Sequence, residues 1–90
     1  MDCYFGNGST YSGSQATTRS GYTCQRWDTD YPHDRRWYAK DPNRFPENSI
    51  SSAENYCRNP WPKGHAPWCY TTDPGKLWEY CGIDKCEGKV

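Results

Sequence analysis

The residues of this chain with the most restrictive chemistry are its cysteines: Cys3, Cys24, Cys57, Cys69, Cys81 and Cys86. A cysteine can act as a nucleophile, bind a metal or form a disulfide, and the number and spacing of cysteines help to decide among these roles. The chain has no Cys-x-x-Cys pair, and an even number of cysteines in 90 residues is typical of a disulfide framework. We therefore expect three disulfides, no metal site and no cofactor.

Catalytic chemistry has little support in the sequence. Glycine-rich phosphate loops, the His-Glu-x-x-His motif and nucleophile-elbow patterns are missing, and His33 and His65 are the only imidazoles. We expect His33 to pack as a hydrogen-bonded structural residue and His65 to lie in a solvated turn. The sequence therefore predicts a protein that is not an enzyme.

Aromatic residues form the second group with an informative spacing. Two short runs, 68–72 and 77–81, flank Asp73-Pro74-Gly75-Lys76, a loop with proline at the second position of a type I turn. This arrangement predicts an antiparallel hairpin, in which every second side chain points to the same face. We expect four rings to line one face of this hairpin: Trp68, Tyr70, Trp78 and Tyr80.

The rest of the chain must position these groups without a large aliphatic core. Leucine, isoleucine and valine together number four residues, whereas Trp, Tyr and Phe number fifteen. Turn signals such as Ser12-Gly13 and Asn59-Pro60 dominate, and no helix-length apolar periodicity is present. The expected fold is small and disulfide-rich, mostly loops and turns with short antiparallel β-hairpins around three disulfides. Tyr11 and Trp27 are expected to be core rings.

The disulfides also indicate a cellular location. Disulfides persist in oxidising compartments, so we expect an extracellular protein, either secreted or the ectodomain of a membrane protein. No segment reaches the length of a membrane span, so no direct membrane insertion is expected. We expect one domain over residues 3–86 with short flanking tails at 1–2 and 87–90, behaving as a monomer when isolated. The sequon Asn7-Gly8-Ser9 makes Asn7 a candidate glycosylation site in an exposed turn.

The charges of the chain argue against nucleic acid as a partner. The formal net charge is zero and the two signs are interleaved. One local exception is a loop segment that carries four cations: Arg35, Arg36, Lys40 and Arg44. These cations form either an ordinary solvated loop or a patch for a sulfated glycan or an acidic protein surface.

Two tryptophans lie in turn-rich, charge-flanked segments. Trp37 and Trp61 have few neighbours in sequence that could bury them, so both are expected at the surface. Exposed tryptophan is a frequent anchor of protein contacts. The sequence therefore predicts a protein partner, with Trp61 as a contact residue.

Over residues 3–86 the chain resembles a kringle domain. The resemblance rests on the order of the six cysteines and on several motifs, including Cys24-Gln25-Arg26-Trp27, Asn55-Tyr56-Cys57-Arg58-Asn59-Pro60, Ala66-Pro67-Trp68-Cys69-Tyr70 and Trp78-Glu79-Tyr80-Cys81. Sequence alone does not select among the pairings of six cysteines. The resemblance implies that Cys3 pairs with Cys86, Cys24 with Cys69, and Cys57 with Cys81.

The resemblance also implies a function. Kringles are non-catalytic binding modules, and many hold a lysine in an aromatic trough between two carboxylates and a cation. The trough rings match Trp68, Tyr70, Trp78 and Tyr80, but the carboxylate positions carry Trp61 and Lys63, and the cation before the second tryptophan is Leu77. We therefore expect poor lysine binding, unless Asp28, Asp30 or Asp34 folds over the trough. Arg35 or Arg36 could replace the cation.

Other departures concern the loop before Cys57. By the resemblance, the interval between Cys24 and Cys57 is four residues longer than in the plasminogen kringles, and the added length falls in the loop that carries Arg35 to Asn48. Ser52 replaces a core leucine, whose space Ile50 and Phe45 are expected to fill. Arg44-Phe45-Pro46-Glu47 is similar to the kringle of Ror-type receptor tyrosine kinases. Three hypotheses follow: a receptor-ectodomain module, a module of a protease or growth-factor relative that binds lysine-bearing proteins or heparin-like glycans, and an engineered kringle binder.

Overall fold

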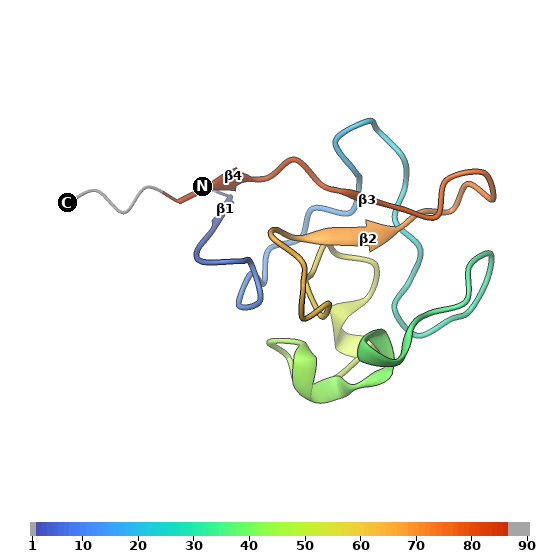
Figure 1. Ribbon diagram of the computed structural model, residues 1–90, viewed down its shortest axis with the longest axis horizontal. Helices are drawn as coiled ribbons and strands as arrows, with labels where there is room; N and C mark the ends of the chain where they lie inside the picture. Colours follow the sequence, from blue (N-terminus) through green and yellow to red (C-terminus); the bar gives the residue numbers. More distant parts are fainter. Residues whose placement is uncertain (1, 87–90) are drawn as a thin grey trace.

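The computed structural model describes residues 2–86, so Met1 and the expected tail at 87–90 lie outside the described residues. Short elements are joined by long loops, and Figure 1 shows them in this order: β1 (Cys3–Tyr4), η1 (Trp37–Lys40), η2 (Pro42–Arg44), η3 (Ser51–Ala53), β2 (Trp68–Tyr70), β3 (Trp78–Tyr80) and β4 (Asp84–Lys85). The η elements are single 3-10 turns. No helix in the described part of the chain is long and apolar enough to cross a membrane.

Strands β2 and β3 form the expected antiparallel hairpin at the centre of the molecule (Figure 1). Trp68 lies opposite Tyr80 and Tyr70 lies opposite Trp78. The turn is closed by a hydrogen bond from the Lys76 amide to the Asp73 carbonyl (3.0 Å) and by one from the Gly75 amide to the Asp73 carboxylate (2.8 Å). The strands are shorter than the aromatic runs that predicted them, because residues 71–77 form the bend.

The second strand pair differs from the expected hairpins. Strands β1 and β4 run parallel, with Cys3 beside Asp84 and Tyr4 beside Lys85. The expectation of short antiparallel hairpins holds for β2 and β3, and this parallel pair adds a feature that the sequence did not predict. The two strands come from opposite ends of the chain and are joined by the Cys3–Cys86 bridge and by a hydrogen bond from the Cys86 amide to the Tyr4 carbonyl (2.7 Å). No turn between them requires an antiparallel direction.

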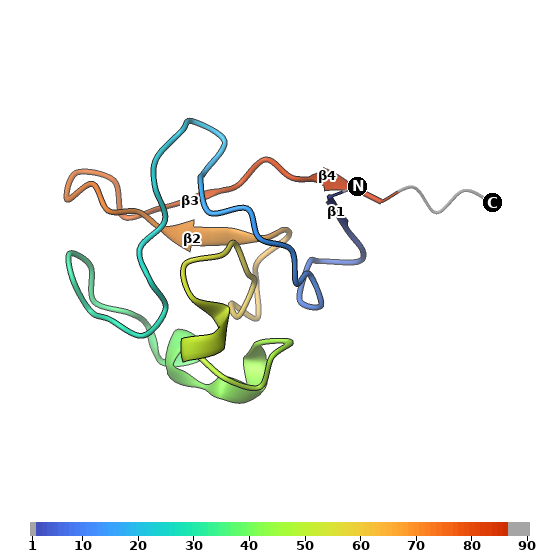
Figure 2. The same cartoon turned by 180° about the vertical axis from the view of Figure 1, so that it is seen from behind.

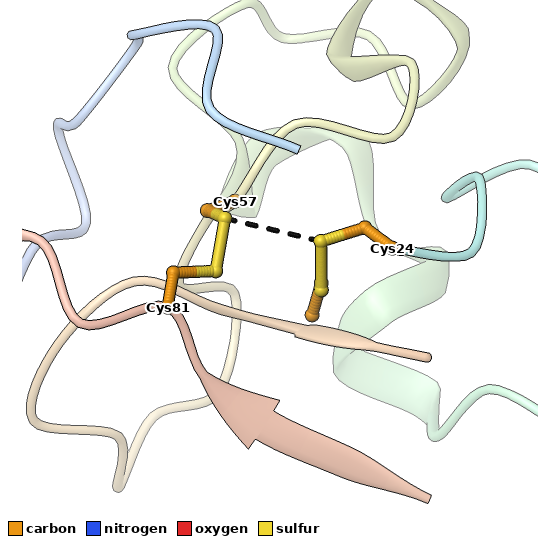
Figure 3. A group of neighbouring side chains, drawn as sticks. Cys24, Cys57 and Cys81 are labelled. Atoms are coloured by element: carbon orange, nitrogen blue, oxygen red, sulfur yellow. Dashed lines mark hydrogen bonds between the residues drawn. A yellow bond between two sulfur atoms is a disulfide. The ribbon is translucent and has the colours of Figure 1, made fainter. Parts of the chain in front are cut away.

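The three disulfides join the pairs that the resemblance implies: Cys3–Cys86, Cys24–Cys69 and Cys57–Cys81. The two inner bridges lie against each other, with the sulfur atoms of Cys24 and Cys57 3.9 Å apart (Figure 3). All four inner cysteines are buried, and their sulfur atoms lie within 4.8 Å of one another. Because each sulfur is bonded to another sulfur, this cluster offers no thiolate to a metal.

The core is built from rings packed on the inner bridges. Trp27 is buried and meets Phe45 and Trp68 edge to face at 5.2 Å in each case, and its indole donates to the Tyr56 carbonyl. Phe45 is buried and Ile50 packs on the core, whereas Ser52 is exposed. Phe45 and Ile50 thus both contribute to the core. The expected core position of Tyr11 is also confirmed.

A charged residue, Arg58, also lies within the core. Arg58 is 1% exposed and binds Glu47, while it also donates to the carbonyls of Gly13 and Cys57, at 2.8 Å each. Its guanidinium lies 5.5 Å from the Tyr11 ring centroid and 5.4 Å from that of Tyr56. A buried guanidinium is tolerated because every side of it has a partner.

The middle loop packs beside the hairpin and carries the three 3-10 turns (Figure 2). The Asp41 side chain accepts a hydrogen bond from the Asn43 amide and so caps η2, where Pro42 is pre-organised for the first position. A hydrogen bond from the Arg36 amide to the Tyr70 hydroxyl (3.0 Å) ties the start of η1 to β2. This contact sets the position of the loop relative to the ring-bearing face of the hairpin.

Glu79 lies on the opposite face of the hairpin and holds the loop around residue 20. The Ser20 hydroxyl donates to its carboxylate at 2.8 Å, and hydrogen bonds from Thr18 and Ser20 hold the pKa of Glu79 below its ordinary value. A carboxyl group with a lowered pKa in the folded state stabilises that state above its unfolded pKa and loses this contribution as the pH falls through the folded pKa.

We expect Glu79→Gln to lower the melting temperature at neutral pH and to reduce the loss of stability on acidification below about pH 4. Thermal melts of the wild type and the variant from neutral to acidic pH measure this difference. The same pH dependence in both proteins would contradict a stabilising role for the ionised Glu79.

Candidate binding trough

A single concave site collects most of the rings that the alternation predicts. Its volume is about 320 Å³, at the small end of ligand sites, and it is lined by Arg36, Tyr38, Trp61, Trp68, Tyr70, Leu77 and Trp78. The hairpin supplies three of the rings, the segment after Cys-Arg-Asn-Pro supplies Trp61, and η1 supplies Tyr38. We call this site the trough.

The rings of the trough brace one another. Trp68 is 2% exposed and forms the floor, with its indole N–H bonded to the Asn59 side chain at 2.9 Å. Trp78 and Trp61 are half-buried and meet edge to face at 5.6 Å, and Tyr38 stacks on Trp61 at 6.4 Å. Such edge and stacked contacts favour fixed ring positions, so the trough is pre-organised for a ligand.

Two rings that the sequence suggested lie outside the trough lining. Tyr80 packs edge to face on Trp78 at 5.0 Å and therefore supports the wall, while its hydroxyl accepts a hydrogen bond from the His65 amide. Trp37 is 63% exposed, as expected, and lies beside Tyr38 at 5.5 Å with the Arg44 guanidinium over its ring. Trp61 is less exposed than expected, because neighbouring rings cover part of it.

The charged group in the lining of the trough is a cation. Arg36 lines it, and no Asp or Glu among residues 2–86 does so. Asp28 is held by Arg26 at 3.0 Å and Asp30 by Arg35 at 2.8 Å, and the bonds from these arginines lower the pKa of each carboxyl group. Neither aspartate replaces the missing carboxylates. Asp34 and Lys63 are exposed and are not part of the lining, so Lys63 does not face the ligand position directly.

The hydroxyls of Tyr38 and Tyr70, which both line the trough, remain protonated at neutral pH. Burial raises the pKa of Tyr70, while the hydrogen bond from the Arg36 amide acts in the opposite direction. Burial also raises the pKa of Tyr38. The Tyr70 oxygen accepts a hydrogen bond from the Arg36 amide, and the Tyr70 and Tyr38 hydroxyls share a hydrogen bond with each other. Tyr38 had no distinguishing pattern in the sequence, since it lies in a loop without alternation.

The expected basic patch is divided by its contacts. Arg35 is paired with Asp30 and also donates to the Trp27 carbonyl, and Arg44 lies 3.6 Å from Asp41. Arg36 and Lys40 have no ion pair within the described range. Of these two unpaired cations, Arg36 lines the trough. Lys40, at the end of η1, is exposed and is not part of the lining.

The remaining candidate residues have simple surroundings. Asn7 is exposed, and its side chain accepts a hydrogen bond from the Ser9 amide. His33 is buried, with its ring bonded to the Asp73 carbonyl at 2.9 Å and its amide to Gln25, as expected for a structural residue. His65 is exposed in its turn.

Comparison with known proteins agrees with this architecture. The family described as "Kringle domain" matches residues 3–86. The chain is 44% identical over 93 residues to the Homo sapiens protein named putative apolipoprotein(a)-like protein 2, an alignment that covers 100% of this chain and 66% of that protein. It is 45% identical over 86 residues to plasminogen of Capra hircus, covering 96% and 65% of the two chains. The chain thus spans slightly less than two thirds of these relatives. With its three bridges and its family match over residues 3–86, the chain is a member of the kringle family.

Proposed function

We propose that this kringle is an extracellular, non-catalytic module of a larger protein, and that it binds a protein partner through the trough without using lysine as the anchor. The observation that carries the proposal is the composition of the trough: five braced rings and Arg36, with no carboxylate among the described lining residues. An ammonium group placed there would lose water without gaining a counter-ion, which costs several kcal/mol.

The ring surface suits a protein contact. Tryptophan and tyrosine bring large apolar areas with few rotatable bonds and dominate the energetics of protein interfaces. Leu77 is 45% exposed at the rim and extends the apolar area of the trough. The three disulfides agree with an oxidising, extracellular setting. A receptor ectodomain of the Ror type, a secreted protease or growth-factor relative, and an engineered binder are all compatible contexts for such a module.

A sulfated glycan is a weaker candidate for the ligand. Two of the four loop cations, Arg35 and Arg44, are already close to acidic side chains. Exposed cations mainly affect the rate of association and are screened by salt.

Peptides selected from a random display library on the oxidised module provide a test. We expect the selected peptides to lose about 2 kcal/mol of binding free energy with Trp61→Ala, as for an interface anchor. The matched control is Trp37→Ala, which removes an exposed tryptophan outside the trough and should cost less than about 0.5 kcal/mol. Calorimetric titration of both variants measures the difference. A larger loss with Trp37→Ala would place the contact surface elsewhere.

A further inference from the structure

We propose that the trough selects a carboxylate on an apolar stem, such as a peptide that ends in an apolar residue or carries an acidic side chain beside one. This inference rests on the proposed function, because it names the chemistry that the same trough recognises. Its polarity is the reverse of that needed for a lysine side chain: the apolar stem lies on the rings, and the charged head is negative.

Arg36 is the first observation behind this inference. It is the only charged residue of the trough lining, and no acidic side chain within residues 2–86 forms an ion pair with it. The backbone amide of Arg36 is fixed on the Tyr70 hydroxyl at 3.0 Å, so the residue is anchored while its side chain is exposed. A guanidinium with free donors on a fixed backbone is suited to a carboxylate, which it can bind through two parallel hydrogen bonds.

Tyr70, whose hydroxyl holds the Arg36 amide, supplies the second observation. The Tyr70 hydroxyl accepts a hydrogen bond from the Arg36 amide, and it also shares a side-chain hydrogen bond with the Tyr38 hydroxyl. Burial raises the pKa of this hydroxyl, so Tyr70 is uncharged at neutral pH and adds no negative charge beside Arg36. The trough thus combines one cation with neutral hydroxyls, whereas the rest of its surface is formed by rings and Leu77.

The acidic residues nearest in sequence leave this charge uncompensated. Asp30 is bound by the adjacent Arg35, and Asp41 lies near Arg44. Asp34 is exposed and does not line the trough. In a chain whose formal net charge is zero, these contacts leave one cation at an apolar cavity. Charge complementarity therefore favours a negative ligand group at this end.

Three small probes with stems of equal length test the polarity: hexanoate, 6-aminohexanoate and hexylamine. We expect amide and indole shifts of the oxidised module to show that hexanoate binds about tenfold more tightly than hexylamine, as for one partly exposed charge-assisted contact. The zwitterion should bind more weakly than hexanoate, because its ammonium would lose water without a carboxylate of the lining to pair with. Equal affinities for hexanoate and hexylamine, or a preference for the amine, would overturn the inference.

Variants of the cation make the test specific. Arg36→Gln should remove the preference for hexanoate, and Arg36→Glu should reverse it. The matched control is Lys40→Gln, which removes a charge from the same loop outside the lining and should keep the preference. The Arg36 side chain is exposed, and the hydrogen bonds of Arg36 within residues 2–86 use its backbone amide and carbonyl, so these variants should keep the near-UV circular dichroism of the wild type. An unchanged preference in Arg36→Gln would overturn the inference.

Peptides then distinguish the source of the carboxylate. Acetyl-Gly-Gly-Leu with a free C-terminus, the same peptide as an amide, and acetyl-Gly-Leu-Glu amide compare a chain end with an acidic side chain. We expect the amidated first peptide to bind about tenfold more weakly than at least one of the two acids. Failure of both acids to exceed the amide would overturn the inference.

The Trp61→Ala variant separates failure of this inference from failure of the proposed function. If the acids and the amide bind equally and Trp61→Ala weakens all three, the proposed trough function stands and only the polarity is wrong. If Trp61→Ala changes the binding of none of them, the proposed function and the inference are both wrong.

Discussion

Replacing either inner disulfide by a pair of serines should unfold the module at room temperature, whereas replacing the terminal disulfide should leave a folded but less stable domain. Loop length alone predicts the opposite order, because the terminal bridge closes the longest loop, with a sequence separation of 83 against 45 and 24. The burial of the inner cysteines, however, predicts that their two bridges matter more than the terminal one. The inner cysteines are 0–2% exposed and touch one another, whereas Cys3 and Cys86 are only partly buried.

The magnitudes support the ranking. Loss of a native disulfide from a small domain costs about 2–5 kcal/mol. At the inner positions, each buried serine hydroxyl without a partner costs about 1–3 kcal/mol more. The sum approaches the whole stability of a small domain, about 5–15 kcal/mol. At the terminal bridge, water can reach the serines, so the second term is small.

Near-UV circular dichroism and thermal melting of the three double variants measure this prediction. The double variant of Cys3 and Cys86 should keep the aromatic signal and a cooperative melt, and both inner double variants should lose them. Equal loss of structure in all three would contradict the dominance of the inner bridges.

Removal of the buried guanidinium should have the second largest effect. Arg58→Met fills a similar space with apolar atoms but leaves Glu47 and the carbonyls of Gly13 and Cys57 without their donor. Breaking a buried pair by removing one partner destabilises proteins by about 3–5 kcal/mol. The same change at Arg26, whose pair with Asp28 lies at the surface, should cost less than about 1 kcal/mol.

Urea titration of Arg58→Met and Arg26→Met gives both free energies of unfolding on one scale. The combined change of Glu47→Gln with Arg58→Met should recover part of the loss, because a neutral amide tolerates the missing guanidinium better than a carboxylate. Similar midpoints for Arg58→Met and Arg26→Met would show that the buried contacts of Arg58 contribute no more than a surface pair.

The sequence predicted those parts of the fold that have a local period. The hairpin and the shared face of Trp68, Tyr70 and Trp78 follow from alternation and a recognisable turn. The disulfide pairing required the resemblance, because several pairings suit the same spacing. The parallel pairing of β1 and β4 had no local signal, since residues at opposite ends of the chain form it.

In the trough, too, the sequence predicted the residues that follow a local pattern but not those that tertiary contacts bring together. Trp61 was expected as an exposed ring, but Tyr38 and Trp78 lie against it and make it a wall of the cavity. Tyr38 itself is brought to the trough by a 3-10 turn in an irregular loop, and such tertiary contacts leave no periodic pattern. The separate roles of Arg35 and Arg36, adjacent in sequence, depend on which of them meets Asp30.

The most direct test of the central claim is a titration of the oxidised module with 6-aminohexanoic acid, followed by tryptophan fluorescence. A trough without carboxylates should give no saturation below about 1 mM, which corresponds to roughly 4 kcal/mol of binding free energy. Near-UV circular dichroism of the same sample controls for the fold. Saturable binding below that concentration, lost in Trp78→Ala, would show that the trough holds a lysine-like ligand after all and would contradict the account.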